Sequence, residues 1–253
     1  MAKYEIKDGV CVISKRTKTI ANKAFLDCKE LISIEIPNSV TKIGYSAFEG
    51  CTNLTSIVIP ESVTEISECT FRNCTALQHV EIPNSVVSIG YAAFEGCTAL
   101  TSIIIPDSVE RIEGPCVGIH PEASREKGAF AGCTGLTSIN LAKIKILGDL
   151  TFYQCTALKE IILPDTLEFV GRYVFSDCTS LEEITIPSSI KSFGNSRPNE
   201  YTRNPFQGNP FSGCTALKSI SMDGSLADGI KFWDSFYSGI KYYEEIEPLI
   251  VRR

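Results

Sequence analysis

The feature that most constrains this chain is a cysteine, usually followed by threonine, that returns at nearly constant spacing. The eight positions are Cys28, Cys51, Cys74, Cys97, Cys133, Cys155, Cys178 and Cys214. The intervals between them are 23, 23, 23, 36, 22, 23 and 36 residues, so two intervals exceed the common period by the same 13 residues. A repeat of this length is typical of a solenoid, in which each copy forms one coil and contacts only its neighbours.

Each copy predicts two short extended segments with a turn between them. Counted from the cysteine, apolar residues recur at +3, +6, +8, +12, +15 and +20. Positions +6 and +8 alternate as in a strand, and a proline at +9 ends that strand because it has no N–H to donate. A second stretch, V-x-x-I, is usually followed by a glycine, which we expect to turn the chain through positive φ. These glycines are Gly44, Gly90, Gly148, Gly171 and Gly194.

A phenylalanine closes every copy and predicts a ladder of rings. The ladder consists of Phe25, Phe48, Phe71, Phe94, Phe130, Phe152, Phe175 and Phe211. A single copy buries too few side chains to offset the conformational entropy of its backbone, so the copies are stable only when stacked.

One repeat domain accounts for the whole chain, residues 1–253. Residues 1–27 are expected to form an N-terminal cap and a partial repeat, with a hairpin at Asp8-Gly9. Residues 28–222 hold eight repeats, with insertions near 113–126 and 195–208. In the C-terminal cap, 223–253, the side chains of Phe232, Phe236 and Ile240 recur at helical spacing and predict a helix.

The cysteine column admits three interpretations: a disulfide framework, a row of metal ligands, or buried thiols. Neighbouring coils lie about 4.8 Å apart with parallel side chains, whereas a disulfide needs Cβ atoms about 3.8 Å apart that point toward each other. A tetrahedral metal needs converging ligands, and a straight file of thiols in a chain with two histidines does not supply them. We therefore expect unpaired, buried thiols, and predict neither a metal nor a cofactor.

Composition and charge bound the class of protein. The chain is 43% hydrophobic and 21% charged, which is typical of a folded globular protein. A net charge of −6 disfavours nucleic acid as a partner. No apolar run approaches the roughly 20 residues of a membrane span, so we expect no direct membrane insertion. The start, MAKYEIKDG, has no signal-peptide pattern, which keeps a cytoplasmic location as one alternative.

The consensus C-T-x-L-x-x-I-x-I-P-x-S-V-x-x-I-G-x-x-A-F-x-G resembles the leucine-rich repeat of the BspA-like family, over roughly residues 20–222. The resemblance implies a leucine-rich-repeat solenoid: a right-handed, curved stack with short parallel strands on its concave side and short extended or helical turns on its convex side. It further implies adhesion or protein binding, at the cell surface or after secretion, and no catalytic residues.

Two groups of residues contain the residue types of a catalytic site. His79 has a serine at the equivalent position of each neighbouring copy, Ser56 and Ser102, and Glu81 follows two residues later. Parallel side chains on an open sheet offer neither an oxyanion hole nor an enclosing pocket, so we interpret them as ordinary exposed side chains. Cys116 and His120, in the first insertion, lack further partners. A hydrolase or glycan-processing enzyme, or a purely structural spacer, remains the alternative to a non-enzymatic binding module.

Outward-facing positions on the first strand of each copy are candidates for binding a protein or glycan. At +7, aliphatic residues alternate with polar ones, and the aliphatic members are Val58, Ile104 and Ile162. At +4 and +5 an acidic cluster forms late in the chain, from Glu160, Glu182 and Glu183. Exposed apolar groups at alternate coils have two interpretations: β-forming residues on a solvated sheet, or a shallow binding face for a protein or glycan.

The two insertions are the favoured specific site for partner binding, and tolerated surface insertions without function are the alternative. Both interrupt the coil at the same point, so their loops should emerge on the same side, with roots about 14 Å apart across three coils. They carry residue types that are frequent in interface hot spots. These residues are His120 and Arg125 in the first insertion, and Arg197, Tyr201, Arg203 and Phe206 in the second.

Overall fold

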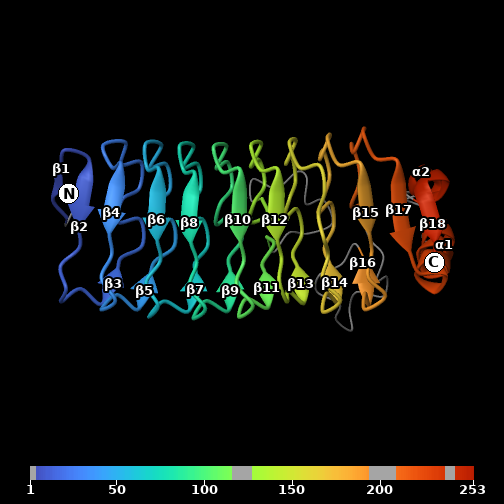
Figure 1. Cartoon of the computed structure of the whole chain (residues 1–253), viewed down its shortest axis with the longest axis horizontal. Coiled ribbons are helices and arrows are strands. Elements are labelled where there is room, and N and C mark those ends of the chain that lie inside the picture. Colours follow the sequence, from blue (N-terminus) through green and yellow to red (C-terminus); the bar gives the residue numbers. More distant parts are fainter. Residues whose placement is uncertain (1–3, 116–126, 194–208, 237–242) are drawn as a thin grey trace.

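Each repeat forms one coil, and the coils stack along the long axis of the molecule from one terminus to the other (Figure 1). The structure is a computed structural model that describes residues 4–115, 127–193, 209–236 and 243–253. Most coils contribute two short strands, so two rows of parallel strands run along the stack. The predicted solenoid is confirmed.

The first strands of successive coils form the long-strand row. Its members are β2 (Val10–Val12), β4 (Ser33–Glu35), β6 (Ser56–Val58), β8 (His79–Glu81), β10 (Ser102–Ile104), β12 (Ser138–Asn140), β15 (Glu183–Thr185) and β17 (Ser219–Met222). The copy that begins at Cys155 joins this row through an isolated bridge between Asn140 and Ile162. In the three-residue strands the middle side chain is buried and its neighbours point outward, as the alternation predicts.

The V-x-x-I stretches form the second, short-strand row. Its members are β3 (Thr19–Ile20), β5 (Lys42–Ile43), β7 (Glu65–Ile66), β9 (Ser88–Ile89), β11 (Arg111–Ile112), β13 (Ile146–Leu147), β14 (Phe169–Val170) and β16 (Ser192–Phe193). They pair in parallel and in register, as in Ile66 opposite Ile89. The second extended segment of each copy is therefore confirmed.

A stack of phenylalanine rings runs through the core. The eight rings have centroids 5.1 to 5.8 Å apart and interplanar angles of 5 to 18°. Tyr4 extends the stack at its N-terminal end, 5.0 Å from Phe25. Each of the eight phenylalanines is at most 4% exposed. Burial and ring contact together stabilise the stacked coils, at about 1.5–3 kcal/mol for each buried ring and about 0.5–1.5 kcal/mol for each ring pair.

The cysteines join each coil to the coil before it. Cys74 Sγ donates to the carbonyl oxygen of Phe48 at 3.0 Å, and the same oxygen accepts the backbone N–H of Cys51 at 3.1 Å. Seven cysteines from Cys51 to Cys214 repeat this contact at 3.0 to 3.2 Å. The ten cysteines of the described residues are free thiols. The prediction of an unpaired thiol column is confirmed, and the thiol also satisfies the second lone pair of a buried carbonyl.

A hydroxyl column makes the corresponding contact at the turn between the two rows. Ser62 Oγ donates to the carbonyl oxygen of Val40 at 2.5 Å, and Ser85 Oγ donates to that of Val63 at 2.7 Å. Ser39, Ser108, Thr166 and Ser189 do the same in their coils. In the turn, where the backbone does not pair as a strand, the serine of the P-x-S-V segment thus donates a hydrogen bond to the preceding coil.

The prediction that the repeat glycines turn the chain through positive φ is wrong. Positive φ occurs two residues later, at Ser46, Cys69 and Ala92. A Cβ on Gly90 would lie 2.7 Å from the backbone nitrogen of Glu68, and one on Gly44 would lie 2.5 Å from that of Asn22. At Gly44 and Gly90 the backbone of the neighbouring coil passes too close for a side chain. Gly148 and Gly171 follow the same rule, and Gly194 lies outside the described residues.

The N-terminal cap is the predicted hairpin. Strand β1 (Ile6–Lys7) pairs antiparallel with β2, with Lys7 opposite Val10. Asp8 and Gly9 both have positive φ, 50° and 81°, as a two-residue turn matched to the strand twist requires.

The C-terminal cap contains helix α1 (Gly224–Phe236), α2 (Tyr243–Ile246), the 3-10 turn η2 (Glu247–Leu249) and strand β18 (Ile250–Arg252). The predicted helix is confirmed as far as Phe236, and Ile240 lies outside the described residues. Strand β18 was not predicted, and it extends the long-strand row by pairing in parallel with β17. None of the described helices is long and apolar enough to cross a membrane.

We expect Phe94→Ala to lower the free energy of unfolding by about 3–5 kcal/mol, because it removes a fully buried ring from the middle of the stack. Urea unfolding followed by circular dichroism measures this loss. Val87→Ala is the control, because Val87 is 50% exposed, and we expect its effect to stay within about 0.5 kcal/mol. Equal losses for the two variants would show that the ring stack does not hold the coils together.

Candidate binding surface

The outward face of the long-strand row carries aliphatic side chains at alternate coils. Val58, Ile104 and Ile162 are 54%, 73% and 83% exposed. Each lies beside a polar residue of a neighbouring coil: Val58 opposite Glu81, and both Ile104 and Ile162 opposite Asn140. The predicted outward orientation of these three residues is confirmed. We call the line formed by Val12, Glu35, Val58, Glu81, Ile104, Asn140 and Ile162 the aliphatic column.

Two exposed valines extend this pattern beyond the residues predicted. Val12, in β2, is 66% exposed and lies opposite Glu35. Val251, in β18, is 51% exposed and lies opposite Ser221. The alternation in the segment Val10-Cys11-Val12 signals the first of them. No sequence pattern signals the second, because it depends on the chain end returning to the sheet.

The predicted acidic cluster is partly neutralised by a lysine from the next coil. Lys218 Nζ lies 2.5 Å from Glu182 Oε2, and this hydrogen bond and charge lower the pKa of Glu182 and raise that of Lys218. Glu160 and Glu183 are exposed on the same face. The repeat places position +4 of one copy beside position +4 of the next, so the sequence alone is enough to predict the pair of Glu182 and Lys218.

The serine, histidine and glutamate of the long-strand row do not form a catalytic site. His79 Nε2 lies 3.2 Å from Glu81 Oε1, and their side chains are 64% and 60% exposed. Ser56 lies opposite His79 in the neighbouring strand, and no hydrogen bond joins their side chains, both of which lie in the described part of the chain. A pair this open to water has no preorganised donors for a developing charge.

A cluster of titratable groups with shifted pKa values lies where the coils close. Arg72 sits between two carboxylates, 3.7 Å from Glu49 and 3.0 Å from Glu95. Burial raises the pKa of Glu95 despite the nearby Arg72, and burial raises that of Cys69 to about 11. Because the thiolate is the nucleophilic form of cysteine, Cys69 is unreactive at neutral pH.

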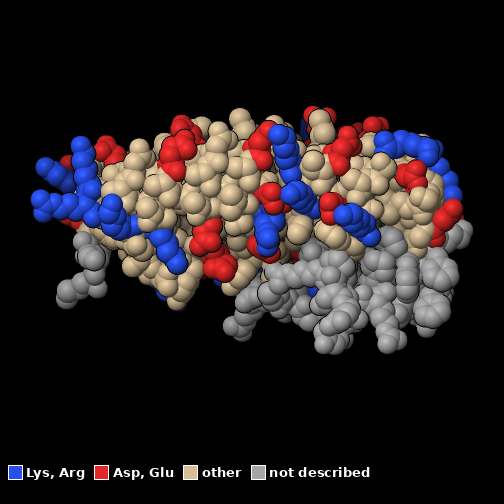
Figure 2. Space-filling view, turned by 90° about the horizontal axis from the view of Figure 1, so that it is seen from below, with Lys and Arg blue, Asp and Glu red and all other residues tan. Residues whose placement is uncertain are grey.

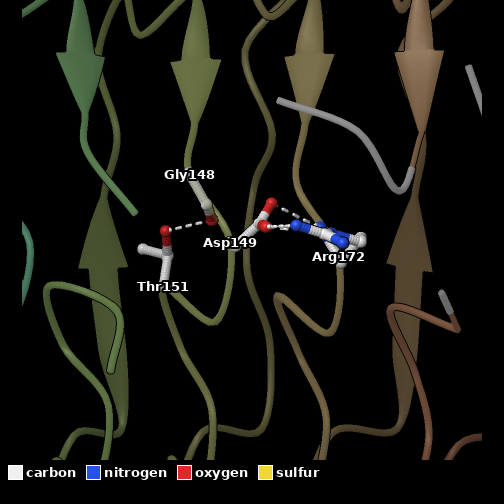
Figure 3. Close-up of polar contacts among 4 residues, drawn as sticks. All are labelled: Gly148, Asp149, Thr151 and Arg172. Atoms are coloured by element: carbon white, nitrogen blue, oxygen red, sulfur yellow. Dashed lines mark hydrogen bonds and ion pairs between the residues drawn. The ribbon is translucent and has the colours of Figure 1, made fainter. Parts of the chain in front are cut away.

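A partly buried ion pair joins two coils in the short-strand half of the molecule. Arg172 donates to Asp149 through its backbone N–H, its Nε and one terminal nitrogen, at 3.0, 2.9 and 2.8 Å (Figure 3). The two side chains are 7% and 16% exposed, for Asp149 and Arg172 respectively. Figure 3 also shows Thr151 donating to the carbonyl of Gly148, at 2.6 Å. The carboxylate is satisfied by its neighbour, so the arrangement holds coils together.

Two surface cavities of the described residues contain few side chains that could act in catalysis or bind a metal. One of about 320 Å³ is lined by Glu65, Glu68 and Glu113 together with Ser67, whose hydroxyl donates to the carbonyl of Ile43. A smaller one of about 190 Å³ lies between the last coil and α2. Within the ranges that the structure describes, no three histidine, cysteine or carboxylate side chains gather in a way that would hold a metal ion.

The insertion residues predicted to bind a partner lie outside the described part of the chain. They are His120, Arg125, Arg197, Tyr201, Arg203 and Phe206. Cys116 also lies outside it.

Comparison with known proteins shows the family. The model of the BspA type leucine rich repeat region, in six copies, matches residues 9–117 and 124–231. The chain belongs to this family. No curated protein matches the sequence.

The chain is similar to solved structures of bacterial leucine-rich repeat proteins, two of which have TM-scores above 0.5. A leucine-rich repeat protein from Bacteroides ovatus is 28% identical with a TM-score of 0.53, over 85% of this chain and 66% of that one. This chain therefore spans about two thirds of that protein. The leucine rich repeat protein of Treponema pallidum is 22% identical with a TM-score of 0.53, over 91% and 92% of the two chains. A leucine rich cell surface protein from Faecalibacterium prausnitzii is 25% identical with a TM-score of 0.39, over 82% and 64%.

The thiol column predicts a loss of stability at alkaline pH. Burial raises the pKa of Cys51 and Cys133 to about 12 in the folded protein, from an ordinary value of 9.0. As the pH rises above about 9, thiols ionise first in the unfolded state, so the free energy of unfolding falls by up to about 1.4 kcal/mol per pH unit for each thiol. Below the unfolded pKa this contribution is fully present.

Urea unfolding across this pH range, in reductant, measures the effect. Cys51→Ala/Cys133→Ala removes two of the thiols and leaves every other titrating group in place. We expect the double variant to be less stable than the wild type at neutral pH and to lose less stability per pH unit above about 9. Parallel pH profiles for the two proteins would contradict the assignment.

We expect Arg172→Met to lower the free energy of unfolding by about 3–5 kcal/mol, because it removes the positive charge and both guanidinium hydrogen bonds from the buried Asp149 carboxylate. Lys218→Met is the matched control, because it breaks the exposed pair with Glu182 and should change the melting temperature little. If both variants melt at the wild-type temperature, the Asp149 pair does not hold the coils together.

Proposed function

We propose that this protein is a non-enzymatic binding module that holds a protein partner against the aliphatic column. The observation that carries the proposal is the exposure of Val58, Ile104 and Ile162 in one line on a rigid sheet. Membership of a repeat family that is generally non-catalytic supports the non-enzymatic part. The open His79–Glu81 pair and the protonated Cys69 support it as well.

The spacing of the column indicates what kind of contact fits it. Coils lie about 4.8 Å apart, so the aliphatic side chains, two coils apart, recur about every 10 Å. Polar groups fill the gaps, at Glu35, Glu81 and Asn140. A partner with apolar anchors at this interval and donors between them would satisfy both kinds of group. The buried middle residue of each strand holds the face in place, which lowers the entropy lost on binding.

The proposed contact surface includes further residues, and the proposal also covers the location of the protein. Glu160, Glu182 and Glu183 lie on the same sheet face and would meet basic groups of the partner. The predicted contributions of His120, Arg125, Arg197, Tyr201, Arg203 and Phe206 belong to the proposal as well, and so does a glycan as an alternative partner. A cell-surface or secreted location is proposed from the family resemblance.

The test combines partner capture with a triple variant. Immobilised protein would capture labelled surface proteins of host or neighbouring cells, and the affinity of the captured partner would then be measured. We expect Val58→Ser/Ile104→Ser/Ile162→Ser to weaken binding at least about tenfold while the protein keeps its melting temperature, because interface anchors carry most of the binding energy.

The control is Leu26→Ser/Val87→Ser, which removes exposed aliphatic side chains, 40% and 50% exposed, away from the column. This variant should bind like the wild type. Unchanged affinity in the triple variant would move the site off the long-strand row and end the proposal for this face.

A further inference from the structure

Basic side chains gather at one end of the molecule. Figure 2, which views the lower edge of Figure 1, shows lysine and arginine concentrated at the end where the chain begins. The residues are Lys15, Arg16 and Lys18, in the turn before β3, and Lys42, the first residue of β5. All four are exposed. We call this group the basic edge.

Backbone contacts between the first two coils bring these four residues together. The backbone N–H of Thr41 donates to the carbonyl of Lys18 at 2.9 Å, and Thr19 lies opposite Lys42 in the paired strands. Ser39 Oγ donates to the carbonyl of Thr17, at 2.8 Å. The cations are therefore presented by a fixed scaffold, although they lie up to 27 positions apart in the chain.

The basic edge differs from the rest of the same side of the solenoid in its lack of counter-charges. Further along, lysines pair with carboxylates of the preceding coil: Lys143 with Asp107 at 3.0 Å, Lys145 with Glu110 at 3.0 Å and Lys191 with Glu168 at 2.7 Å. Among the described residues, no carboxylate lies within 4.0 Å of the cationic atoms of the basic edge. Four positive charges that have no carboxylate partner in the described part of the chain therefore stand together on a protein of net charge −6.

We propose that the basic edge binds an acidic polysaccharide through its sulfate or carboxylate groups. The two coils that carry the cations are about 4.8 Å apart at the backbone, so a linear polyanion that crosses them can meet Lys18 and then Lys42. Exposed polar side chains surround the cations, at Ser14, Thr19 and Asn38, and can hydrogen-bond sugar hydroxyls. The site lies apart from the aliphatic column and does not rest on the function proposed for it.

The surroundings favour a flexible linear polyanion over a membrane or a nucleic acid. Exposed carboxylates follow on the same side, at Glu61, Glu65 and Asp107, and would meet an anionic lipid surface together with the cations. A linear chain can cross the edge without meeting them. Proteins that bind single-stranded nucleic acids present rows of aromatic rings on which the bases stack. In the first two coils the exposed aromatic ring of the described residues is Tyr45, which Lys23 covers at 5.6 Å.

The test measures binding to heparin, a sulfated polysaccharide, and to polygalacturonate, a carboxylated one. At about 0.15 M salt, where charges separated by more than about 8 Å are screened, we expect the full chain to bind at least one of them and to release it as salt rises. The variant Lys15→Ser/Arg16→Ser/Lys18→Ser/Lys42→Ser should bind at least about tenfold more weakly. Because all four side chains are exposed, its melting temperature should stay that of the wild type.

The matched control is Lys143→Ser/Lys145→Ser/Lys191→Ser/Lys218→Ser, which removes the same number of positive charges from lysines that already have carboxylate partners. Its affinity should change by less than about twofold, because those charges are neutralised within the protein. Equal weakening in both variants would show a response to net charge alone and would overturn the proposal. The same conclusion follows if neither polysaccharide binds, or if single-stranded DNA or phosphatidylserine vesicles bind more tightly than both.

Discussion

The hydrogen bonding of each coil to the next is the constraint on which the rest of the structure depends. Phe48 donates to Thr70 at 2.9 Å and Phe71 donates to Ala93 at 2.8 Å, so the backbone at the closing phenylalanine is fixed by the following coil. The carbonyl of the same phenylalanine accepts a backbone N–H of its own coil and the cysteine thiol of the following one. Rings held at this spacing must stack, and residues at one position of the repeat must share one size and shape. The interior columns of cysteine, phenylalanine and small residues follow from that requirement.

Burial within these columns also limits the chemistry that the protein can carry. A thiol surrounded by apolar side chains resists ionisation, so the evenly spaced cysteines act as small apolar donors instead of nucleophiles or ligands. Asp149, a buried charged group, is hydrogen-bonded by the partly buried Arg172 of the neighbouring coil. Reactive groups are therefore absent from the interior of the described coils, and recognition is left to the outward positions. There the repeat imposes only direction and spacing, which leaves residue type free to vary from coil to coil.

Two outward surfaces, the long-strand row and the basic edge, differ in the residue types that they carry. On the long-strand row the exposed side chains alternate between aliphatic and polar along the stack, which gives an ordered face. On the opposite edge of the first coils, positive charges collect without a carboxylate partner among the described residues, whereas the same edge further along carries alternating lysine and glutamate in ion pairs. Both surfaces arise from the same geometry, since equivalent residues in successive coils stand side by side at the strand spacing.

The sequence alone determined the solenoid, its two extended segments per copy, the phenylalanine ladder, the free thiols and the outward position of Val58, Ile104 and Ile162. It could do so because a repeated period and local alternation encode these features within each 23-residue copy. Only the tertiary structure decided the reason for the glycines, which is the close approach of Glu68 to Gly90. Only the structure shows that β18 pairs beside β17. Only the structure shows that Lys42 lies next to Lys18, with no carboxylate of the described residues between them. These contacts join residues of different coils, so their geometry and charge depend on how two copies pack against each other, which the pattern within one copy does not specify.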